Sequence, residues 1–247
     1  KHDIEQLLPA QIDSARIRYE RSTLSFLHPG QSAELYIDDV YFSAKDGLAE
    51  TRYIFLDGNN LPGAWQGRSH FTIAETGFGT GLNFLAAWNL FEKTATPDQT
   101  LEFISFELYP LSASEIEAHL SIWAEEFKTT LPVFIQKYPD DLTGAHVVQI
   151  TERVMLRLFF GDVNDDLPRL DVPVDCWFLD GFKPASNPEM WSDIVFENVG
   201  RLTNINGSFA TFTSAGVVKR GLRAAGFGVK RISGFGYKRH MLVGQKI

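Results

Sequence analysis

The chain has 247 residues, of which 44% are hydrophobic and 22% are charged. A chain of this length can bury roughly 70–75% of its unfolded surface in one core, so we expect one α/β domain. No apolar run approaches the roughly 20 residues that span a bilayer, and the opening residues lack the apolar segment of a secretory signal, which favours a cytoplasmic protein. A single cysteine excludes an intrachain disulfide.

Charge is distributed unevenly along the chain. The net charge is −8, but residues 201–247 hold nine of the 23 basic residues and none of the 31 acidic ones. Exposed charges more than about 10 Å away are largely screened at ordinary salt, so a basic edge can bind phosphates on an acidic protein. The alternative is a solvated basic surface without a partner.

The first predicted elements form a small N-terminal extension over residues 1–66. Short β-type runs at residues 35–37 and 52–56 are separated by turns rich in Asp, Gly and Asn. This pattern predicts hairpins that lead into the main fold.

From residue 67 to residue 247, predicted strands alternate with predicted helices. Buried strands are expected at residues 70–74, 101–106, 154–160, 174–179 and 208–212, and helices at residues 82–93, 112–127, from 188 and at 215–225. Residues 229–243 are predicted to form a terminal hairpin. The alternation predicts a Rossmann-like, mostly parallel seven-stranded sheet with a C-terminal antiparallel hairpin.

A glycine-rich turn follows the first of these strands, with the sequence Glu-Thr-Gly-Phe-Gly-Thr-Gly. Alternating glycines let a ligand lie against the main chain and the helix N-terminus. The third glycine comes one residue too early for a dinucleotide fingerprint, which favours S-adenosylmethionine. A turn without a ligand is the alternative. The candidate cofactor-binding residues here are Glu75, Thr76, Gly77, Phe78, Gly79, Thr80, Gly81 and Asn83.

Three later strand ends carry carboxylates. Glu107 lies 26 residues after Gly81, somewhat beyond the roughly 20 expected for an acid that binds ribose hydroxyls. Gly161 and Asp162 could contact an adenine amine, although an ordinary turn aspartate fits there as well. Asp180 follows a strand too apolar to tolerate an acid that is neither hydrogen-bonded nor functional, so we expect it in both the cofactor and the catalytic site.

Four blocks of the sequence resemble the methyltransferase part of the MnmC family, the tRNA 5-methylaminomethyl-2-thiouridine biosynthesis proteins. They are residues 39–43 with 50–53, residues 75–85, residues 179–185 with 187–191, and residues 210–216 with 239–242. The resemblance implies a class I methyltransferase fold and methyl transfer from S-adenosylmethionine to the amine of 5-aminomethyl-2-thiouridine at the tRNA wobble position. Lys183 and His240 depart from the pattern expected for the family.

The resemblance also implies roles for residues and partners. Asp180 would accept the N–H bonds of the amine, and Phe182 would stack on a flipped-out base. Bifunctional members of the family carry a flavin-dependent oxidase domain, so such a domain or protein is an expected partner. No residue is assigned to a metal. Phosphates of the anticodon stem-loop would be bound by Lys219, Arg220, Arg223, Lys238 and Arg239.

Three other functions stay open at this point. A nicotinamide-dependent dehydrogenase is disfavoured by the glycine spacing. A non-catalytic tRNA-binding module would keep the fold but have no need of the acids at the strand ends. A methyltransferase for a small-molecule amine suits the acidic net charge and is disfavoured by the basic C-terminal edge.

Overall fold

A computed structural model describes residues 47–185 and 187–247. The strand expected at residues 35–37 and the sequence block at 39–43 lie outside the described residues. The strands are β1 His70–Glu75, β2 Thr100–Glu107, β3 Gly144–Gln149, β4 Val154–Phe160, β5 Val174–Phe178, β6 Thr203–Thr211, β7 Phe227–Ser233 and β8 His240–Lys246.

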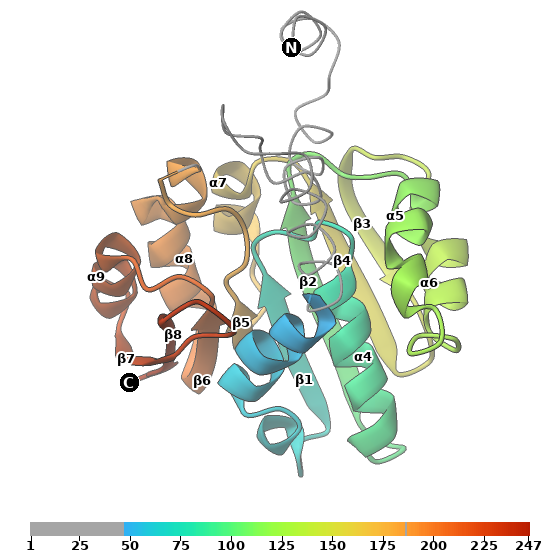
Figure 1. The fold of residues 1–247 in the computed structure, drawn as a ribbon, viewed down its shortest axis with the longest axis horizontal. Helices are drawn as coiled ribbons and strands as arrows, with labels where there is room; N and C mark the ends of the chain where they lie inside the picture. The colour runs from blue at the N-terminus through green and yellow to red at the C-terminus, as the bar shows by residue number, and fades with distance from the viewer. Residues whose placement is uncertain (1–46, 186) are drawn as a thin grey trace, which may run out of the picture.

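Helices cover both faces of the sheet (Figure 1). They are α4 Leu82–Thr94, α5 Ala113–Leu120, α6 Leu131–Lys137, α7 Val163–Asp166, α8 Asp193–Leu202 and α9 Gly216–Ala224, with short 3-10 or π turns η1 Arg52–Leu56, η2 Asp57–Asn59, η3 Gly63–Trp65, η4 Ser121–Trp123, η5 Leu167–Arg169 and η6 Pro188–Trp191. Among these described helices, none has the length and apolar content required to cross a membrane.

The sheet has the order β3-β4-β2-β1-β5-β6-β8-β7. Strands β1, β2, β4, β5 and β6 run parallel, and β8 is antiparallel to both β6 and β7. The predicted α/β fold, with a mostly parallel sheet and a C-terminal hairpin, is therefore confirmed. Strand β1 pairs with β2 on one side and with β5 on the other, so the strand order reverses at β1. Ligands usually bind at the carboxyl ends of the strands at such a switch point.

The predicted count of seven strands is wrong, since the described residues form a sheet of eight. The additional strand is β3, which pairs antiparallel with β4 at the edge of the sheet. Its side chains are mostly exposed, so its sequence lacks the apolar pattern from which a strand is predicted. Backbone pairing with β4 holds it in place.

The expected hairpin strand at residues 52–56 is also wrong, because residues 47–59 form a continuous helical segment of α, π and 3-10 turns. Its buried residues include Leu48, Thr51, Phe55 and Asn59, which recur at helical spacing. The β-branched and aromatic residues at 53–55 suggested a strand locally, but packing against the sheet decides the conformation.

Side chains from this helical segment anchor it on the sheet. The Asn59 amide donates to the carbonyl oxygens of Phe55 at 3.0 Å and Trp177 at 3.2 Å, and it accepts from Ser208 Oγ at 2.7 Å. A Cβ at Gly58 would lie 2.8 Å from the Ala210 side chain, so glycine permits the close approach. The helical segment is thereby fixed beside the ends of β5 and β6.

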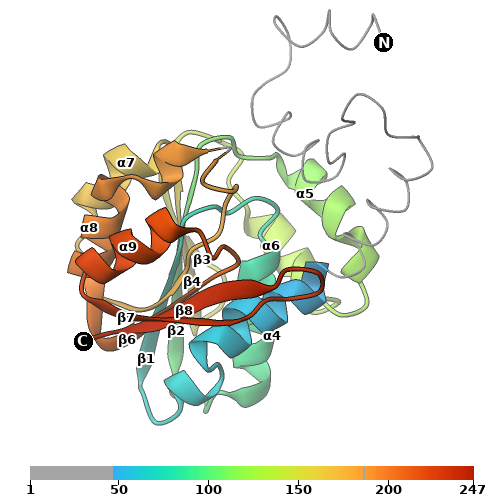
Figure 2. The ribbon, with the colours of Figure 1, turned by 60° about the vertical axis from the view of Figure 1, so that its left-hand side comes forward.

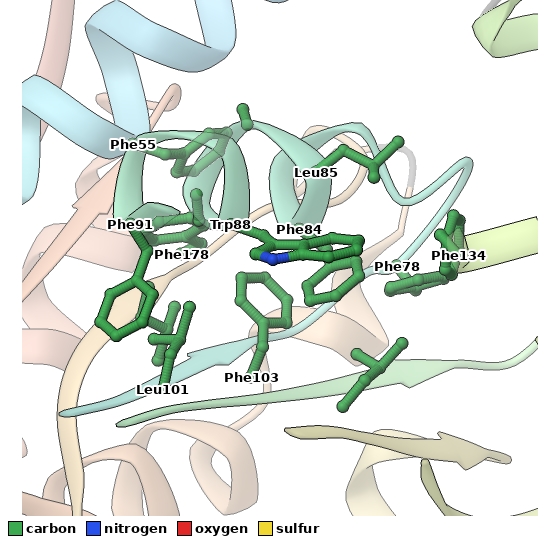
Figure 3. Packing of buried hydrophobic residues seen from close by; sticks show 14 of the residues in the cluster. Phe55, Phe78, Phe84, Leu85, Trp88, Phe91, Leu101, Phe103, Phe134 and Phe178 are labelled. Atoms are coloured by element: carbon green, nitrogen blue, oxygen red, sulfur yellow. The ribbon is translucent and has the colours of Figure 1, made fainter. Parts of the chain in front are cut away.

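Aromatic packing fixes α4 on the same face of the sheet (Figure 3). Phe84 of α4 lies 5.3 Å from Phe103, measured between ring centroids, and Phe103 lies 5.8 Å from Phe178. Phe55 stacks on Phe178 at 5.3 Å. Large apolar side chains that are wholly buried each contribute about 1.5–3 kcal/mol, so this cluster holds the start of α4 in a defined position.

Helix ends differ from the prediction in two places. A capping box of Ser112 and Glu115 starts α5, but the helix expected to reach residue 127 ends at Leu120 and a 3-10 turn follows. The helix expected from Pro188 begins as the 3-10 turn η6, and the regular helix α8 starts only after the Ser192 cap. At the second place, Pro188 and the Ser192 cap change the local hydrogen bonding.

Candidate active site

A cavity of about 380 Å³ opens at the carboxyl ends of β1, β2 and β5. Ligand sites commonly have volumes of this order. Its wall combines the helical segment at 47–59, the glycine-rich turn, two strand ends and the C-terminal hairpin. The lining residues are Gly47, Glu50, Thr51, Ile54, Phe55, Gly77, Phe78, Gly79, Thr80, Leu82, Asn83, Glu107, Tyr109, Leu111, Asp180, Gly181, Phe182, Phe212 and Lys238.

The glycine-rich turn presents main chain to this cavity. Gly79 has φ of +55°, and a Cβ built on it would meet nothing within 4 Å. Gly81 has φ of +77°, and a Cβ there would come within 2.9 Å of the Phe78 ring. Gly79 thus keeps a cavity wall bare, whereas Gly81 permits the packing that starts α4.

Glu107 ends β2 directly beside that turn. Its Oε2 accepts from the backbone N–H of Gly79 at 2.9 Å, and its Oε1 accepts from Tyr109 N–H at 3.0 Å. The carboxylate is therefore held at the cavity wall by main-chain donors. Its position at the end of the strand next to β1 is where an acid can accept from ribose hydroxyls.

Asp180 lines the same cavity from the loop after β5. Its Oδ1 accepts from Gly181 N–H at 2.7 Å, and its Oδ2 accepts from the Asn83 amide at 2.8 Å. Burial raises the pKa of Asp180 to about 6, although the bonds from Gly181 and Asn83 lower it. A carboxylate with this pKa is mostly ionised at pH 7 and lies close to the range useful for proton transfer.

Next to Asp180, a second carboxyl group is completely buried. Glu75 accepts from the Asn83 amide at 2.7 Å and from Ser105 Oγ at 2.7 Å. Burial raises the pKa of Glu75 well above its usual value, and the charge of Asp180 adds to this shift. The Asn83 amide nitrogen therefore bridges two carboxyl groups, while Thr51 Oγ1 donates to its oxygen at 2.8 Å and fixes the orientation of the amide.

The structure brings together many of the residues expected to bind a cofactor. Gly77, Phe78, Gly79, Thr80, Asn83, Glu107 and Asp180 line one cavity, and so does Phe182. Glu75, Thr76 and Gly81 do not line it. Thr76 supports the cavity wall, since its Oγ1 donates to the Asp180 carbonyl oxygen at 2.7 Å.

Gly161 and Asp162 are not among the lining residues. Gly161 N–H donates to the Glu107 carbonyl at 3.0 Å, which places this loop next to the end of β2. The Asp162 carboxylate caps α7 and accepts from Asn164 N–H at 2.8 Å. In this structure, Asp162 therefore serves as a helix cap beside the cavity.

The predicted phosphate-binding residues occupy two places. Lys219, Arg220 and Arg223 lie on α9, whose buried face carries Val218 and Leu222. Lys238 and Arg239 lie between β7 and β8. Lys238 differs from the others, because it lines the cavity and pairs with Glu50. Among the residues described by the structure, Lys219, Arg220, Arg223 and Arg239 form no ion pair.

Several lining residues were missed by the sequence interpretation, including Glu50, Thr51, Phe55, Tyr109 and Phe212. The first three come from the helical segment at 47–59, of which residues 52–56 are predicted as strand. Its apolar and small polar residues recur at helical spacing, and that signal could have placed them on one face. Phe212 follows β6, and the parallel pairing of β6 with β5 brings it to the same edge of the sheet as Asp180.

Comparisons with known proteins support this description of the fold. Residues 125–247 match a family model described as S-adenosyl-L-methionine-dependent methyltransferase. The chain is 44% identical over 229 residues to the tRNA 5-methylaminomethyl-2-thiouridine biosynthesis bifunctional protein MnmC of Marinomonas sp., covering 92% of this chain and 34% of that protein. It is 48% identical over 224 residues to the protein of the same name from Vibrio cholerae, covering 84% and 32%.

The chain therefore spans about a third of the length of these relatives. Among solved structures, it is similar to MNMC2 from Aquifex aeolicus, with a TM-score of 0.59 and 23% identity over 79% of this chain and 59% of that one. This structural similarity concerns the fold.

Proposed function

We propose that this chain, which belongs to the S-adenosyl-L-methionine-dependent methyltransferase family, acts on tRNA as the MnmC proteins that it resembles are named to do. Its proposed reaction is methylation of the amine of 5-aminomethyl-2-thiouridine at the wobble position. The observation that carries this proposal is the shared cavity. The bare glycine turn and the Asp180 carboxylate open into the same space, as cofactor and acceptor must do for direct transfer.

The residues present fit S-adenosylmethionine. The open space at Gly79 leaves room for a ligand against the main chain, and Glu107 offers acceptors for ribose hydroxyls. Glu107 and Asp180 give the wall a negative character that suits a sulfonium. When bound, the cofactor supplies a methyl group already activated by its positive sulfur.

The chain's own residues then prepare the acceptor. An alkyl ammonium has a pKa of about 10.4 in water and has no lone pair, so it must lose a proton to solvent water before it reacts. Apolar side chains such as Ile54, Phe55 and Leu111 line the cavity and favour the neutral amine by desolvation. The Asp180 carboxylate accepts an N–H bond and orients the nitrogen. Orientation of this kind contributes several kcal/mol, up to roughly 7–11 in the best cases.

The RNA would approach along the basic C-terminal edge. Chemistry on a base requires that it leave its stack, and Phe182 at the cavity wall offers a stacking surface. Arg220 and Arg223 would bind phosphates of the anticodon stem-loop and supply affinity without sequence information. Tyr237, fully exposed beside Lys238, adds an aromatic surface at the hairpin tip.

The preceding step would belong to a second unit. On the resemblance to bifunctional MnmC proteins, we infer a flavin-dependent oxidase domain or protein that removes a carboxymethyl group and leaves the amine that this site methylates. A tRNA substrate also implies a cytoplasmic enzyme.

Labelled S-adenosylmethionine tests the proposed function. The protein is incubated with the labelled cofactor and tRNA that lacks the final methyl group, and the RNA is digested to nucleosides. We expect label in 5-methylaminomethyl-2-thiouridine, reduced about a hundredfold or more in Asp180→Ala because the amine loses its acceptor. Label in another nucleoside would remove the substrate assignment, and full activity of Asp180→Ala would remove Asp180 from the mechanism.

A further inference from the structure

An ion pair in the cavity wall has no role in the function described so far. Lys238 Nζ lies 2.6 Å from Glu50 Oε1, although the two residues are 188 positions apart. Their side chains are 43% and 35% exposed. Pairs this exposed contribute little to stability, typically about 0–1 kcal/mol, so stability gives a weak reason for placing two charges at the cavity.

Other contacts already hold the two segments together. Figure 2 shows the β7–β8 hairpin lying over the helical segment at 47–59. Tyr53 Oη donates to the Ser233 carbonyl at 3.0 Å, and the rings of Tyr53 and Phe235 lie 5.9 Å apart. The ion pair of Glu50 and Lys238 is therefore not needed to hold the hairpin against the helical segment.

The surroundings of the Lys238 ammonium are those of a bound alkyl ammonium. Besides Glu50, it lies 4.9 Å from the centroid of the Phe212 ring, a distance typical of cation–π attraction. Glu50, Phe212 and Lys238 all line the cavity that contains Asp180. The charges of Glu50 and Lys238 act on Asp180 in opposite senses, since Glu50 raises its pKa and Lys238 lowers it.

We propose that Glu50 and Phe212 form the subsite that captures the acceptor as an ammonium, and that Lys238 occupies this subsite until the acceptor displaces it. This inference rests on the proposed function and adds to it the residues that select a cationic acceptor. The carboxylate and the ring recognise a primary ammonium on a short alkyl arm, whereas a neutral group in the same place leaves the pair of Glu50 and Lys238 intact.

Binding of two anticodon stem-loops tests this inference. One carries 5-aminomethyluridine at the wobble position and the other carries neutral 5-methyluridine, and both are titrated against protein saturated with S-adenosylhomocysteine. The wild type should bind the aminomethyl stem-loop more tightly. The selectivity is the dissociation constant of the methyl stem-loop divided by that of the aminomethyl stem-loop. In Glu50→Gln this ratio should fall about tenfold, toward one. In Lys238→Met it should rise severalfold, because the internal competitor is gone.

A matched variant removes the same charge elsewhere on the hairpin. Lys230→Met lies on β7, outside the cavity wall, and should change both affinities equally. A kinetic readout separates capture from support of the fold, since Glu50→Gln should raise KM for the aminomethyl stem-loop more than it lowers kcat. Affinity for S-adenosylhomocysteine should be unchanged.

The outcomes distinguish this inference from the proposed function. If the wild type transfers methyl groups to tRNA yet the binding ratio is unchanged in Glu50→Gln, the subsite is overturned and the function stands. If Glu50→Gln does not fold, an unchanged ratio in Lys238→Met overturns the subsite. If the wild type methylates no tRNA, the proposed function itself fails.

Discussion

Asn83 places one amide nitrogen between two carboxyl groups, and this arrangement governs how the site titrates. The amide donates to Asp180 at 2.8 Å and to Glu75 at 2.7 Å, while Thr51 holds its oxygen. Without the amide, two carboxyl groups in a poorly hydrated place would have no shared donor. Each hydrogen bond to an ionised group stabilises the ionised form and lowers its pKa.

The pH dependence of methyl transfer should therefore change in Asn83→Leu. In the wild type, kcat should fall as the pH drops through about 6, because Asp180 becomes protonated and no longer accepts from the amine. Loss of the amide raises the pKa of Asp180, so this acid limb should move to higher pH. The measurement is kcat against pH from about 5 to 8.

Asn89→Leu provides the control, since Asn89 is also buried on α4 but donates to Glu126 Oε1 at 3.0 Å, outside the cavity lining. An acid limb at the same pH in wild type and Asn83→Leu would contradict the role given to the amide.

At the scale of elements, the glycine turn between β1 and α4 makes the sharpest prediction. Gly79→Val should weaken S-adenosylhomocysteine binding by more than about tenfold, because the side chain would enter the cavity. Calorimetric titration gives the affinity, and thermal unfolding gives the change in stability.

Gly144→Val is the matched control for Gly79→Val. Gly144 has φ of +70°, and a Cβ there also meets nothing within 4 Å, so the backbone strain is similar and the site is remote at the start of β3. Both variants should lose similar stability, and only Gly79→Val should lose affinity. Equal affinities in the two variants would show that the turn does not face the ligand.

The elements also show how far the sequence predicts the fold. Strands β1, β2 and β5 were predictable because they are almost wholly buried and rich in apolar residues. Edge strand β3 escaped prediction because its exposed side chains need no apolar pattern. The prediction for residues 52–56 is wrong because their local composition favours a strand, whereas the buried residues of the segment at 47–59 recur at helical spacing and pack on the sheet as a helix.

The candidate site divides in the same way. The turn after β1, Glu107 and Asp180 could be predicted to lie close together, because parallel strands that pair with one another place their carboxyl ends at one edge. Phe212 could also be placed there, since it follows β6, which runs parallel to β5. Glu50 and Thr51 could not, because the docking of the helical segment at 47–59 depends on tertiary packing. No sequence pattern indicates that Lys238 lies in the cavity wall while the other predicted phosphate-binding residues lie outside it.

On the scale of the whole molecule, the basic C-terminal edge counteracts the acidic net charge. Arg220 and Arg223 lie on α9, within residues 201–247, which contain no acidic residue. A local positive surface can bind a polyanion when the remaining charges lie beyond the screening length.

Arg220→Gln with Arg223→Gln should weaken binding of the anticodon stem-loop and lower its salt dependence. The magnitude of the negative slope of log K against log salt should decrease by about two, one for each phosphate that is no longer neutralised. Filter binding at several salt concentrations measures both quantities. Lys128→Gln with Arg169→Gln removes the same charge from other exposed positions and should leave the slope unchanged. Equal slopes in the two double variants would place the RNA elsewhere.

The most direct test of the account is the structure of the protein crystallised with S-adenosylhomocysteine. We predict that the ribose hydroxyls lie against Glu107 and that the thioether sulfur lies between the main chain of Gly77 and Gly79 and the carboxylate of Asp180. Electron density for the ligand at another position, or a sulfur turned away from Asp180, would contradict the central claim that one cavity serves both the methyl donor and the acceptor amine.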